Sequence, residues 1–224
     1  MRHGYLLSTL LLAAATAHAG VIINGTRLVY HGDKKESSLG LSNPDTTDYL
    51  VQSWVDSGGK NLAKAPFLIT PPLFRLDAQE DNVLRVVRTG GNLPEDRESL
   101  YWLNIKAIPS SKHVEGMNTL QIAINTRIKL LYRPTSVKGK PEDVANKLEW
   151  HREGNDLVVN NPTPFYMNFQ KVTLNGHKVD KATWAIPETE THFALPGNVS
   201  GSTVAYSIIT DYGSISQTWS KSVH

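Results

Sequence analysis

The sequence NTLQIAINTRIKLLYRP, residues 118–134, carries the pattern on which the rest of the chain depends. Its first half alternates aliphatic side chains with polar or small ones, a period of two that is typical of a β-strand with one apolar face. The aliphatic positions are Leu120, Ile122 and Ile124. Residues 128–134 are apolar except for two cations, Lys129 and Arg133. An aliphatic row followed by two cations predicts a strand that is lent to a partner protein.

Strand patterns also fill the rest of the chain, where short runs of β-branched and aromatic residues end at Gly, Pro, Asn or Asp. Residues 93–109 (LPEDRESLYWLNIKAIP) are apolar on both faces, as in a strand inside a sandwich. Together with residues 118–134 they predict a long hairpin, and Asn175-Gly176 predicts a tight one. No run of helical length has a 3.6-residue period. These patterns predict an all-β, antiparallel sandwich or barrel.

Length and composition predict two domains. The chain has 224 residues, which is enough for two domains of about a hundred residues each. The segment TSVKGKPEDVANK, residues 135–147, is rich in Pro, Gly and charge and has no apolar periodicity, which indicates a boundary. We therefore predict β domains at residues 20–136 and 141–224, joined by a linker at 137–140.

The first residues, MRHGYLLSTLLLAAATAHA, have the form of a secretory signal peptide. A basic residue precedes an apolar run, and Ala17 and Ala19 form a small-residue cleavage site. We predict a signal peptide at residues 1–19 and a mature start at Gly20. No later stretch is apolar over the length that a membrane span requires, so we expect an exported, soluble protein. The chain has no cysteine, so hydrophobic cores must stabilise it without disulfides.

Charge and motif content argue against several functional classes. Removing Arg2 lowers the formal net charge from +2 to +1, which gives no reason to expect nucleic acid or a membrane surface as a partner. The GxSxG, P-loop and GxGxxG motifs are absent, and the histidines beyond residue 19 do not have the i,i+2 or i,i+4 spacing of common metal motifs. We expect no enzymatic activity, no metal, no cofactor and no small-molecule substrate.

Arg133 lies in an apolar strand and therefore needs a carboxylate, because an unpaired buried charge costs on the order of several kcal/mol. Glu98 and Asp211 are the best candidates. Glu98 also lies close in sequence to Glu95 and Asp96, and two of these acids could form a pair for acid–base catalysis. We favour the interpretation that these three acids lie in a turn and that one of them has a structural role.

Residues 93–109 resemble the signature of the periplasmic chaperones of the chaperone–usher pathway, which assemble pili (fimbriae). That signature contains a Leu-Pro pair, a turn with an acidic-basic-Glu-Ser sequence, an aromatic-rich strand with Asn, and an Ile-Pro ending. The resemblance continues at residues 128–134, 161–164 and 211–213, and it covers essentially all of residues 20–224.

The resemblance implies two immunoglobulin-like β-sandwich domains set at an angle, with a cleft between them. It also implies a periplasmic protein that binds and stabilises pilus subunits and delivers them to an outer-membrane usher by donor-strand complementation. In this process a strand of the chaperone completes the sandwich of the subunit. Two alternatives remain: a secreted carbohydrate-binding or adhesin-like module, and an exported hydrolase or metal enzyme.

The resemblance further implies roles for individual residues. Arg27 and Lys129 would hold the C-terminal carboxylate of the subunit, and the donated row would be Leu120, Ile122 and Ile124. The buried interdomain charge network would consist of Glu98, Arg133 and Asp211. Lys129 is an odd number of positions from the aliphatic row, so it points to the opposite face of the strand unless twist or a bulge intervenes.

The loop at residues 110–117 is short, which resembles the short-loop branch of the family and agrees with the absence of cysteine. An exposed aliphatic strand is prone to pair with another edge, so self-association through the donor strand is a further expectation.

Overall fold

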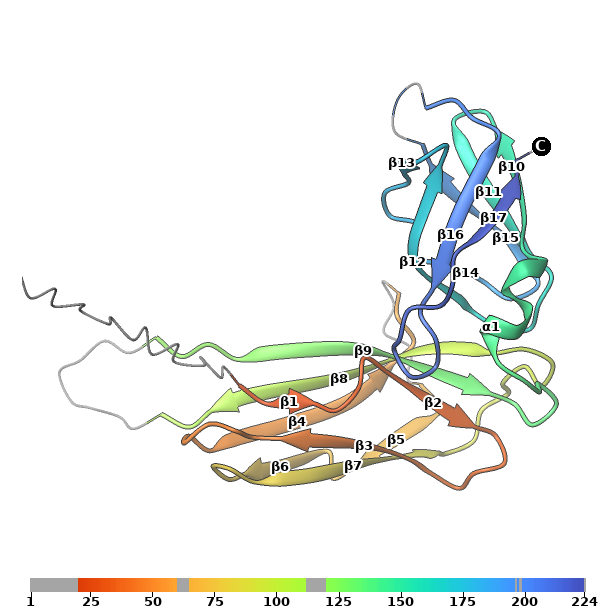
Figure 1. The fold of residues 1–224 in the computed structure, drawn as a ribbon. Coiled ribbons are helices and arrows are strands. Elements are labelled where there is room, and N and C mark those ends of the chain that lie inside the picture. Colours follow the sequence, from red (N-terminus) through yellow and green to blue (C-terminus); the bar gives the residue numbers. More distant parts are fainter. Residues whose placement is uncertain (1–19, 60–64, 112–119, 196, 198, 224) are drawn as a thin grey trace, which may run out of the picture.

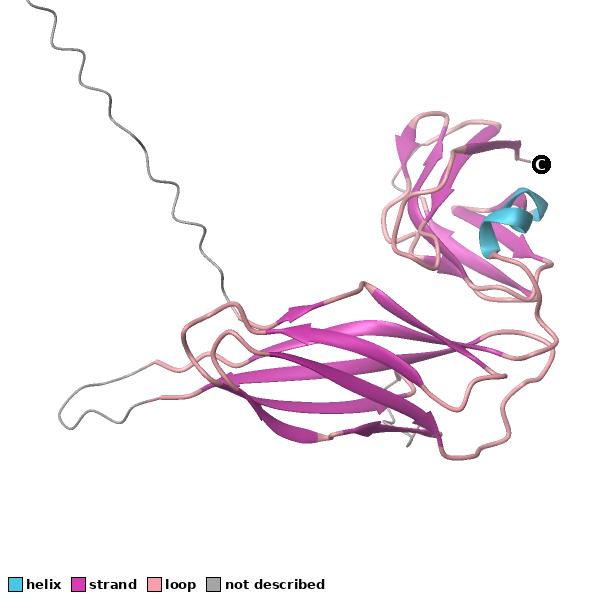
Figure 2. Cartoon of the chain, turned by 60° about the horizontal axis from the view of Figure 1, so that its bottom comes forward, coloured by secondary structure: helices cyan, strands magenta, loops and turns pink. Residues whose placement is uncertain are grey.

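The computed structural model describes residues 20–59, 65–111, 120–195, 197 and 199–223. It contains two β-sandwiches, one of which stands on the end of the other so that the molecule has an angular shape (Figure 1). Strands make up nearly all of the regular structure (Figure 2). The predicted signal peptide at residues 1–19 and most of the loop at 110–117 lie outside the described residues.

The first sandwich consists of two sheets that enclose one core. Its described strands are β1 (Ile22–Ile23), β2 (Arg27–His31), β3 (Ser37–Ser42), β4 (Tyr49–Asp56), β5 (Phe67–Thr70), β6 (Leu73–Leu76), β7 (Asp81–Arg88), β8 (Ser99–Pro109) and β9 (Ile124–Arg133). One sheet has the order β1-β3-β7-β5 and the other the order β2-β9-β8-β4-β6. The chain therefore changes sheets between β1 and β2, which allows β2 to run parallel to β9.

The second sandwich begins with a short helical segment and continues as strands. Its described elements are α1 (Pro141–Val144), the 3₁₀ helix η1 (Ala145–Lys147), β10 (Glu149–Glu153), β11 (Asp156–Asn161), β12 (Met167–Leu174), β13 (His177–Lys178), β14 (Trp184–Ala185), β15 (Thr189–Ala194), β16 (Thr203–Ile208) and β17 (Trp219–Ser222). The sheets are β10-β11-β15 and β13-β12-β16-β17, and β14 also pairs with β12.

Each sandwich has its own hydrophobic core, as strands with alternating burial require. In the first, Leu41, Leu84, Leu103 and Leu130 are fully buried between the sheets, and each contributes about 1.5–3 kcal/mol by burial. The second core contains an aromatic cluster of Trp150, Phe169 and Tyr206.

The tight hairpin predicted at Asn175-Gly176 is confirmed. It connects β12 to β13, and both residues have positive φ angles, 46° and 83°. Two consecutive positive φ angles are what a type I′ hairpin turn requires, and Asn-Gly adopts them at low cost.

The predicted long hairpin is confirmed as β8 and β9, with one difference at its free end. The ladder runs without a register shift from the pair Ala107–Ile124 to the pair Ser99–Tyr132. Leu120 and Ile122 precede β9 and belong to no strand, although the sequence predicted a strand there. In this register Ile122 would face Pro109, which is the last residue of β8 and has no N–H to donate, and Leu120 lies beyond the end of β8.

The continuous register settles the question of strand parity. Because no bulge lies between Ile124 and Lys129, these two side chains project from opposite faces of β9. The core face of β9 carries the buried Ile128, Leu130 and Tyr132. Lys129 therefore lies on the face turned away from the first core and toward the second domain.

The segment between the two sandwiches has a definite structure. Val137 packs in the second core, and α1 begins at Pro141. The boundaries at residues 136 and 141 stay a prediction. In the described part of the chain, no helix is long and apolar enough to cross a bilayer.

Candidate functional site

Two cations lie side by side where the domains meet. Arg27 is the first residue of β2, and the parallel ladder places it directly opposite Lys129 on β9. Side chains that are paired in this way project from the same face of the sheet. Two like charges at adjacent positions repel each other, so an anion bound between or beside them would stabilise the pair.

The contacts of the two cations come mainly from the second domain. Arg27 Nη1 donates a hydrogen bond of 3.1 Å to the carbonyl oxygen of Ile209. Arg27 Nε is buried and has no hydrogen-bond acceptor within the described ranges. Lys129 Nζ donates to the side-chain oxygen of Asn168 at 2.5 Å and lies 4.6 Å from the ring centre of Trp184.

The electrostatics of the pair also favour an anion. Burial lowers the pKa of Lys129 to about 8, and the nearby charge of Arg27 acts in the same direction. Burial likewise lowers the pKa of Arg27, against the opposing effect of Asp211. Both charges are thus held in an environment that disfavours them, and a bound carboxylate would relieve that cost while accepting the free Arg27 donor.

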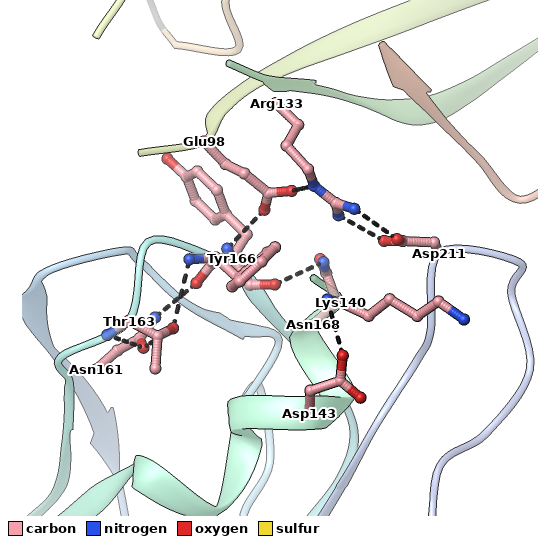
Figure 3. A network of polar contacts seen from close by, with 10 residues as sticks. Glu98, Arg133, Lys140, Asp143, Asn161, Thr163, Tyr166, Asn168 and Asp211 are labelled. Atoms are coloured by element: carbon pink, nitrogen blue, oxygen red, sulfur yellow. Dashed lines mark hydrogen bonds and ion pairs between the residues drawn. The ribbon is translucent and has the colours of Figure 1, made fainter. Parts of the chain in front are cut away.

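Arg133, the last residue of β9, has a different environment from Lys129 (Figure 3). Its Nε donates to Glu98 at 2.7 Å, and its two terminal nitrogens donate to the two carboxylate oxygens of Asp211 at 2.7 and 2.8 Å. The structure thus brings Glu98, Arg133 and Asp211 together. Glu98 and Arg133 belong to the first sandwich, whereas Asp211 follows β16 in the second. The network therefore crosses between the domains.

Glu98 connects the domains a second time. Its other carboxylate oxygen accepts a 2.8 Å hydrogen bond from the backbone N–H of Tyr166, and its own N–H donates to the carbonyl of Pro164. Burial raises the pKa of Glu98 to about 7, although Arg133 and the N–H of Tyr166 favour the ionised form. This acid is fully occupied by structural partners, in agreement with the structural interpretation of the acidic turn.

The loop that carries Asp211 fits closely against the first domain. Gly213 has a φ of 83°, and a Cβ atom at this position would lie 2.7 Å from the side-chain oxygen of Thr26. Only glycine combines that backbone conformation with such a close approach. The Asp211-Tyr212-Gly213 sequence therefore places the Asp211 carboxylate beside Arg133. It also lets the loop contact Thr26, which immediately precedes Arg27 and β2.

The aliphatic row lies far from the cations, at the open end of the first sandwich. Leu120, Ile122 and Ile124 are 87%, 64% and 50% exposed, values that place them outside the core. Ile122 and Ile124 line a cavity of about 230 Å³ together with Val21 and Ile23. These side chains extend the core face of β9 into solvent.

Sequence reasoning missed the second-domain side chains that complete the site. Asn168 on β12 and Trp184 on β14 contact Lys129, and Trp184 packs edge-to-face on Trp102 of β8 with ring centres 6.1 Å apart. No local pattern marks these residues, because they meet Lys129 only through the docking of the domains. Within the described ranges, no group of three or more His, Cys, Asp or Glu side chains is placed to hold a metal ion.

Comparison with protein families gives two matches that together span most of the chain. Residues 20–138 match the N-terminal domain of PapD, described as a pili and flagellar-assembly chaperone. Residues 143–220 match the C-terminal domain of the pili assembly chaperone PapD.

Curated proteins and solved structures agree with the family match. The probable fimbrial chaperone LpfB of Escherichia coli O157:H7 is 43% identical over 218 residues, which cover 96% of this chain and 94% of LpfB. The chaperone protein FimC of E. coli K12 is 39% identical over 95% of this chain and 88% of FimC.

Among solved structures, a chain of the Salmonella enterica complex of the SafA pilin with the SafB chaperone has a TM-score of 0.84 at 41% identity, covering 93% of this chain and 98% of its own length. The E. coli chaperone DraB has a TM-score of 0.81 at 40% identity, over 92% of this chain and 97% of DraB. The predicted fold of two immunoglobulin-like domains set at an angle is thereby confirmed. The chain belongs to the PapD family of pilus-assembly chaperones.

Proposed function

We propose that this protein captures pilus subunits in the periplasm by donor-strand complementation and delivers them to an outer-membrane usher. It acts without catalysis, metal, cofactor or small-molecule substrate. The observation that carries the proposal is an exposed aliphatic row at the unpaired start of β9, together with a cation pair formed by Lys129 farther along β9 and Arg27 on the neighbouring β2. Within the described residues, neither of these cations forms an ion pair. Membership of the family and the likeness to a chaperone in a pilin complex support the proposal.

Arg27 and Lys129 form the anchor for the C-terminal carboxylate of the subunit. The free Nε of Arg27 and the remaining donors of Lys129 supply charge-assisted hydrogen bonds to its oxygens. Asn168 already offers Lys129 an amide oxygen, which is a neutral counterpart of a carboxylate oxygen. The incoming carboxylate is therefore bound where Asn168 and Arg27 converge on Lys129.

The segment with Leu120, Ile122 and Ile124 is the donor strand. Its backbone is unpaired before Ile124, so it can form a ladder with a subunit that lacks a strand. Burial of three aliphatic side chains contributes roughly 5–9 kcal/mol before ordering costs. Because Ile124 and Lys129 lie on opposite faces of β9, the bound subunit touches both faces of this strand. The anchored carboxylate fixes the register in which the row enters the subunit.

The network of Glu98, Arg133 and Asp211 holds the two domains at their angle. We assign the strand-lending domain to residues 20–136, the linker to 137–140 and the second domain to 141–224. The buried ion pairs are directional, so they specify one relative orientation of the sandwiches and keep the anchor assembled from both.

We expect Ile122→Asp to abolish the capture of subunits without destabilising the free protein. Ile122 is 64% exposed, so an aspartate there remains hydrated in the free state but would be buried in the subunit. Co-purification with pilus subunits from periplasm measures capture, and thermal unfolding measures stability. Leu73→Asp is the matched control, because Leu73 is an exposed aliphatic on β6 at the opposite edge of the sheet from β2.

A clear loss of stability in Ile122→Asp would instead indicate that the row is part of the core, as a carbohydrate-binding or adhesin-like module would require. The same variant tests self-association. If free molecules pair through their donor strands, light scattering shows dimers for the wild type and only monomers for Ile122→Asp. Monomers of the wild type at high concentration would contradict pairing.

The capture of subunits should weaken as the pH rises through about 8. Lys129 has a pKa of about 8 in the free protein, so it loses its charge above this value, whereas Arg27 stays charged. A bound carboxylate raises the pKa of Lys129, so binding takes up a proton near and above pH 8, and the affinity falls as the pH increases. Titration with a peptide from the C terminus of a subunit, between about pH 6 and pH 10, measures the effect. The dependence should disappear in Lys129→Ala; its persistence there would assign the titration to another group.

We expect Asn168→Asp to inhibit capture. The new carboxylate would sit beside Lys129 at the 2.5 Å contact now made by the amide oxygen and would compete with the carboxylate of the subunit. It would also raise the pKa of Lys129 and stabilise the free protein. Asn146→Asp, an exposed change in η1, is the control for added negative charge. Normal capture by Asn168→Asp would show that the carboxylate of the subunit binds elsewhere.

A further inference from the structure

The cavity beside Lys129 continues onto the second domain as a basic groove. It has a volume of about 410 Å³, and its lining includes three further lysines, Lys171, Lys178 and Lys181. Most of the remaining lining is apolar and consists of Phe169, Val172, Val179, Ala182 and Trp184. Among the described residues, no acidic side chain lines this groove, which we call the lysine groove.

The lysine groove faces the space in which a subunit would lie. Apart from Lys129 of β9, its residues come from β12, β13, β14 and the turn between β13 and β14. In Figure 1, β12 and β13 lie on the side of the second domain that looks into the open angle above β9. A subunit bound along β9, with its carboxylate at Lys129, would therefore present its C-terminal segment to the groove.

The charges of the groove are poorly neutralised by the chain itself. Lys171, Lys178 and Lys181 are all exposed. Lys178 has one partner, Asp180, at 3.7 Å, and both side chains are more than two-thirds exposed, so the pair is weak. Within the described ranges, Lys171 and Lys181 form no ion pair.

Lys181 lies in the turn between β13 and β14, at the rim of the groove. Lys181 has a φ of 62°, a left-handed conformation that is uncommon for a residue with a side chain. Glycine would adopt it more easily, yet the chain carries a lysine at the rim of the groove.

We propose that the lysine groove binds acidic side chains in the C-terminal segment of the subunit, adjacent to the carboxylate held by Arg27 and Lys129. The proposal rests on the proposed function and adds a preference among subunits. Each contact between exposed charges is weak. The groove therefore contributes to the choice of subunit and to the rate of association, and it supplies little of the affinity for the subunit. Subunits with glutamate or aspartate a few residues before the C terminus are then preferred.

The test uses the full mature chain and two synthetic peptides. Both are short peptides of alternating valine and threonine with a free C-terminal carboxylate, and they carry either glutamates or glutamines at the third and fifth positions from the C terminus. The groove variant replaces Lys171, Lys178 and Lys181 with glutamine, which removes charge from exposed positions. The matched control replaces the exposed Lys34, Lys35 and Lys147 with glutamine and changes the net charge equally.

We expect the wild type and the control to bind the glutamate peptide about three- to tenfold more tightly than the glutamine peptide at low salt. The groove variant should bind both peptides equally, and added salt should reduce the wild-type preference. Equal binding of both peptides by the wild type, or a preference that survives in the groove variant or is lost in the control, would overturn the proposal. If the wild type binds neither peptide, or Lys129→Ala binds both as well as the wild type does, the carboxylate anchor itself is wrong.

Discussion

Arg133→Ala is expected to lower the free energy of unfolding by about 3–5 kcal/mol, a far larger loss than a substitution on the exposed surface should cause. The change leaves Glu98 buried without its cation and frees Asp211, while the side chains of both Glu98 and Arg133 are at most 4% exposed. It also removes the guanidinium that lies 5.0 Å from the ring centre of Phe165. For a chain of this size, the melting temperature should fall by about 6–20 °C.

Thermal or urea unfolding followed by tryptophan fluorescence measures this effect, with Arg75→Ala as the control. Arg75 also forms two ion pairs, with Asp48 and Asp77, but its side chain is 68% exposed, so its loss should leave the melting temperature unchanged. Equal shifts in the two variants would contradict the buried network.

Asp211→Asn separates the orienting role from stability. It keeps the pair of Glu98 with Arg133 but weakens the bidentate contact between the domains. We therefore expect a smaller loss of stability and a broader distribution of interdomain distances, measured with one spin label in each domain. An unchanged distribution would show that other contacts, such as Trp102 with Trp184, fix the angle.

Lys129→Ala is expected to abolish the capture of subunits while leaving the fold intact. Loss of one partner from a buried, hydrogen-bonded charge pair costs about 2–5 kcal/mol of binding, which weakens affinity about 30-fold or more. In the free protein the charged ammonium is disfavoured, because burial lowers its pKa to about 8. That cost to the folded state is present below about pH 8 and disappears as the pH rises toward the ordinary lysine pKa. Alanine removes it, so the melting temperature at neutral pH should not fall.

Co-purification of subunits from periplasm and unfolding of the free variant are the two measurements. Lys147→Ala serves as the control, since Lys147 is an exposed lysine in η1. Capture by Lys129→Ala at the wild-type yield would refute the anchor. A fall in both capture and stability would mean that Lys129 is a structural residue and not a binding one.

Much of the fold follows from local sequence patterns. Alternation at period two and Gly-, Pro- and Asn-rich turns predicted two all-β domains, and Asn175-Gly176 predicted its hairpin because few sequences tolerate two positive φ angles. The alternation at Leu120, Ile122 and Ile124 predicted a strand, yet only Ile124 lies in one. Alternation describes which face a side chain would occupy, whereas a strand also needs backbone hydrogen bonds, and Pro109, which would face Ile122 at the end of β8, has no N–H to donate.

The sequence by itself determined that Arg133 needed carboxylates, because a cation in an apolar strand cannot remain unpaired. Only the tertiary structure decided which interactions Lys129 and Arg133 make. Regular register places Lys129 on the face opposite Ile124, and docking of the second domain brings Asn168 and Trp184 to it. These contacts join residues about forty or more positions apart in the sequence, so no local period records them. Burial and register, both consequences of packing, direct Lys129 to Asn168 and Trp184 of the second domain and give Arg133 its ion pairs with Glu98 and Asp211.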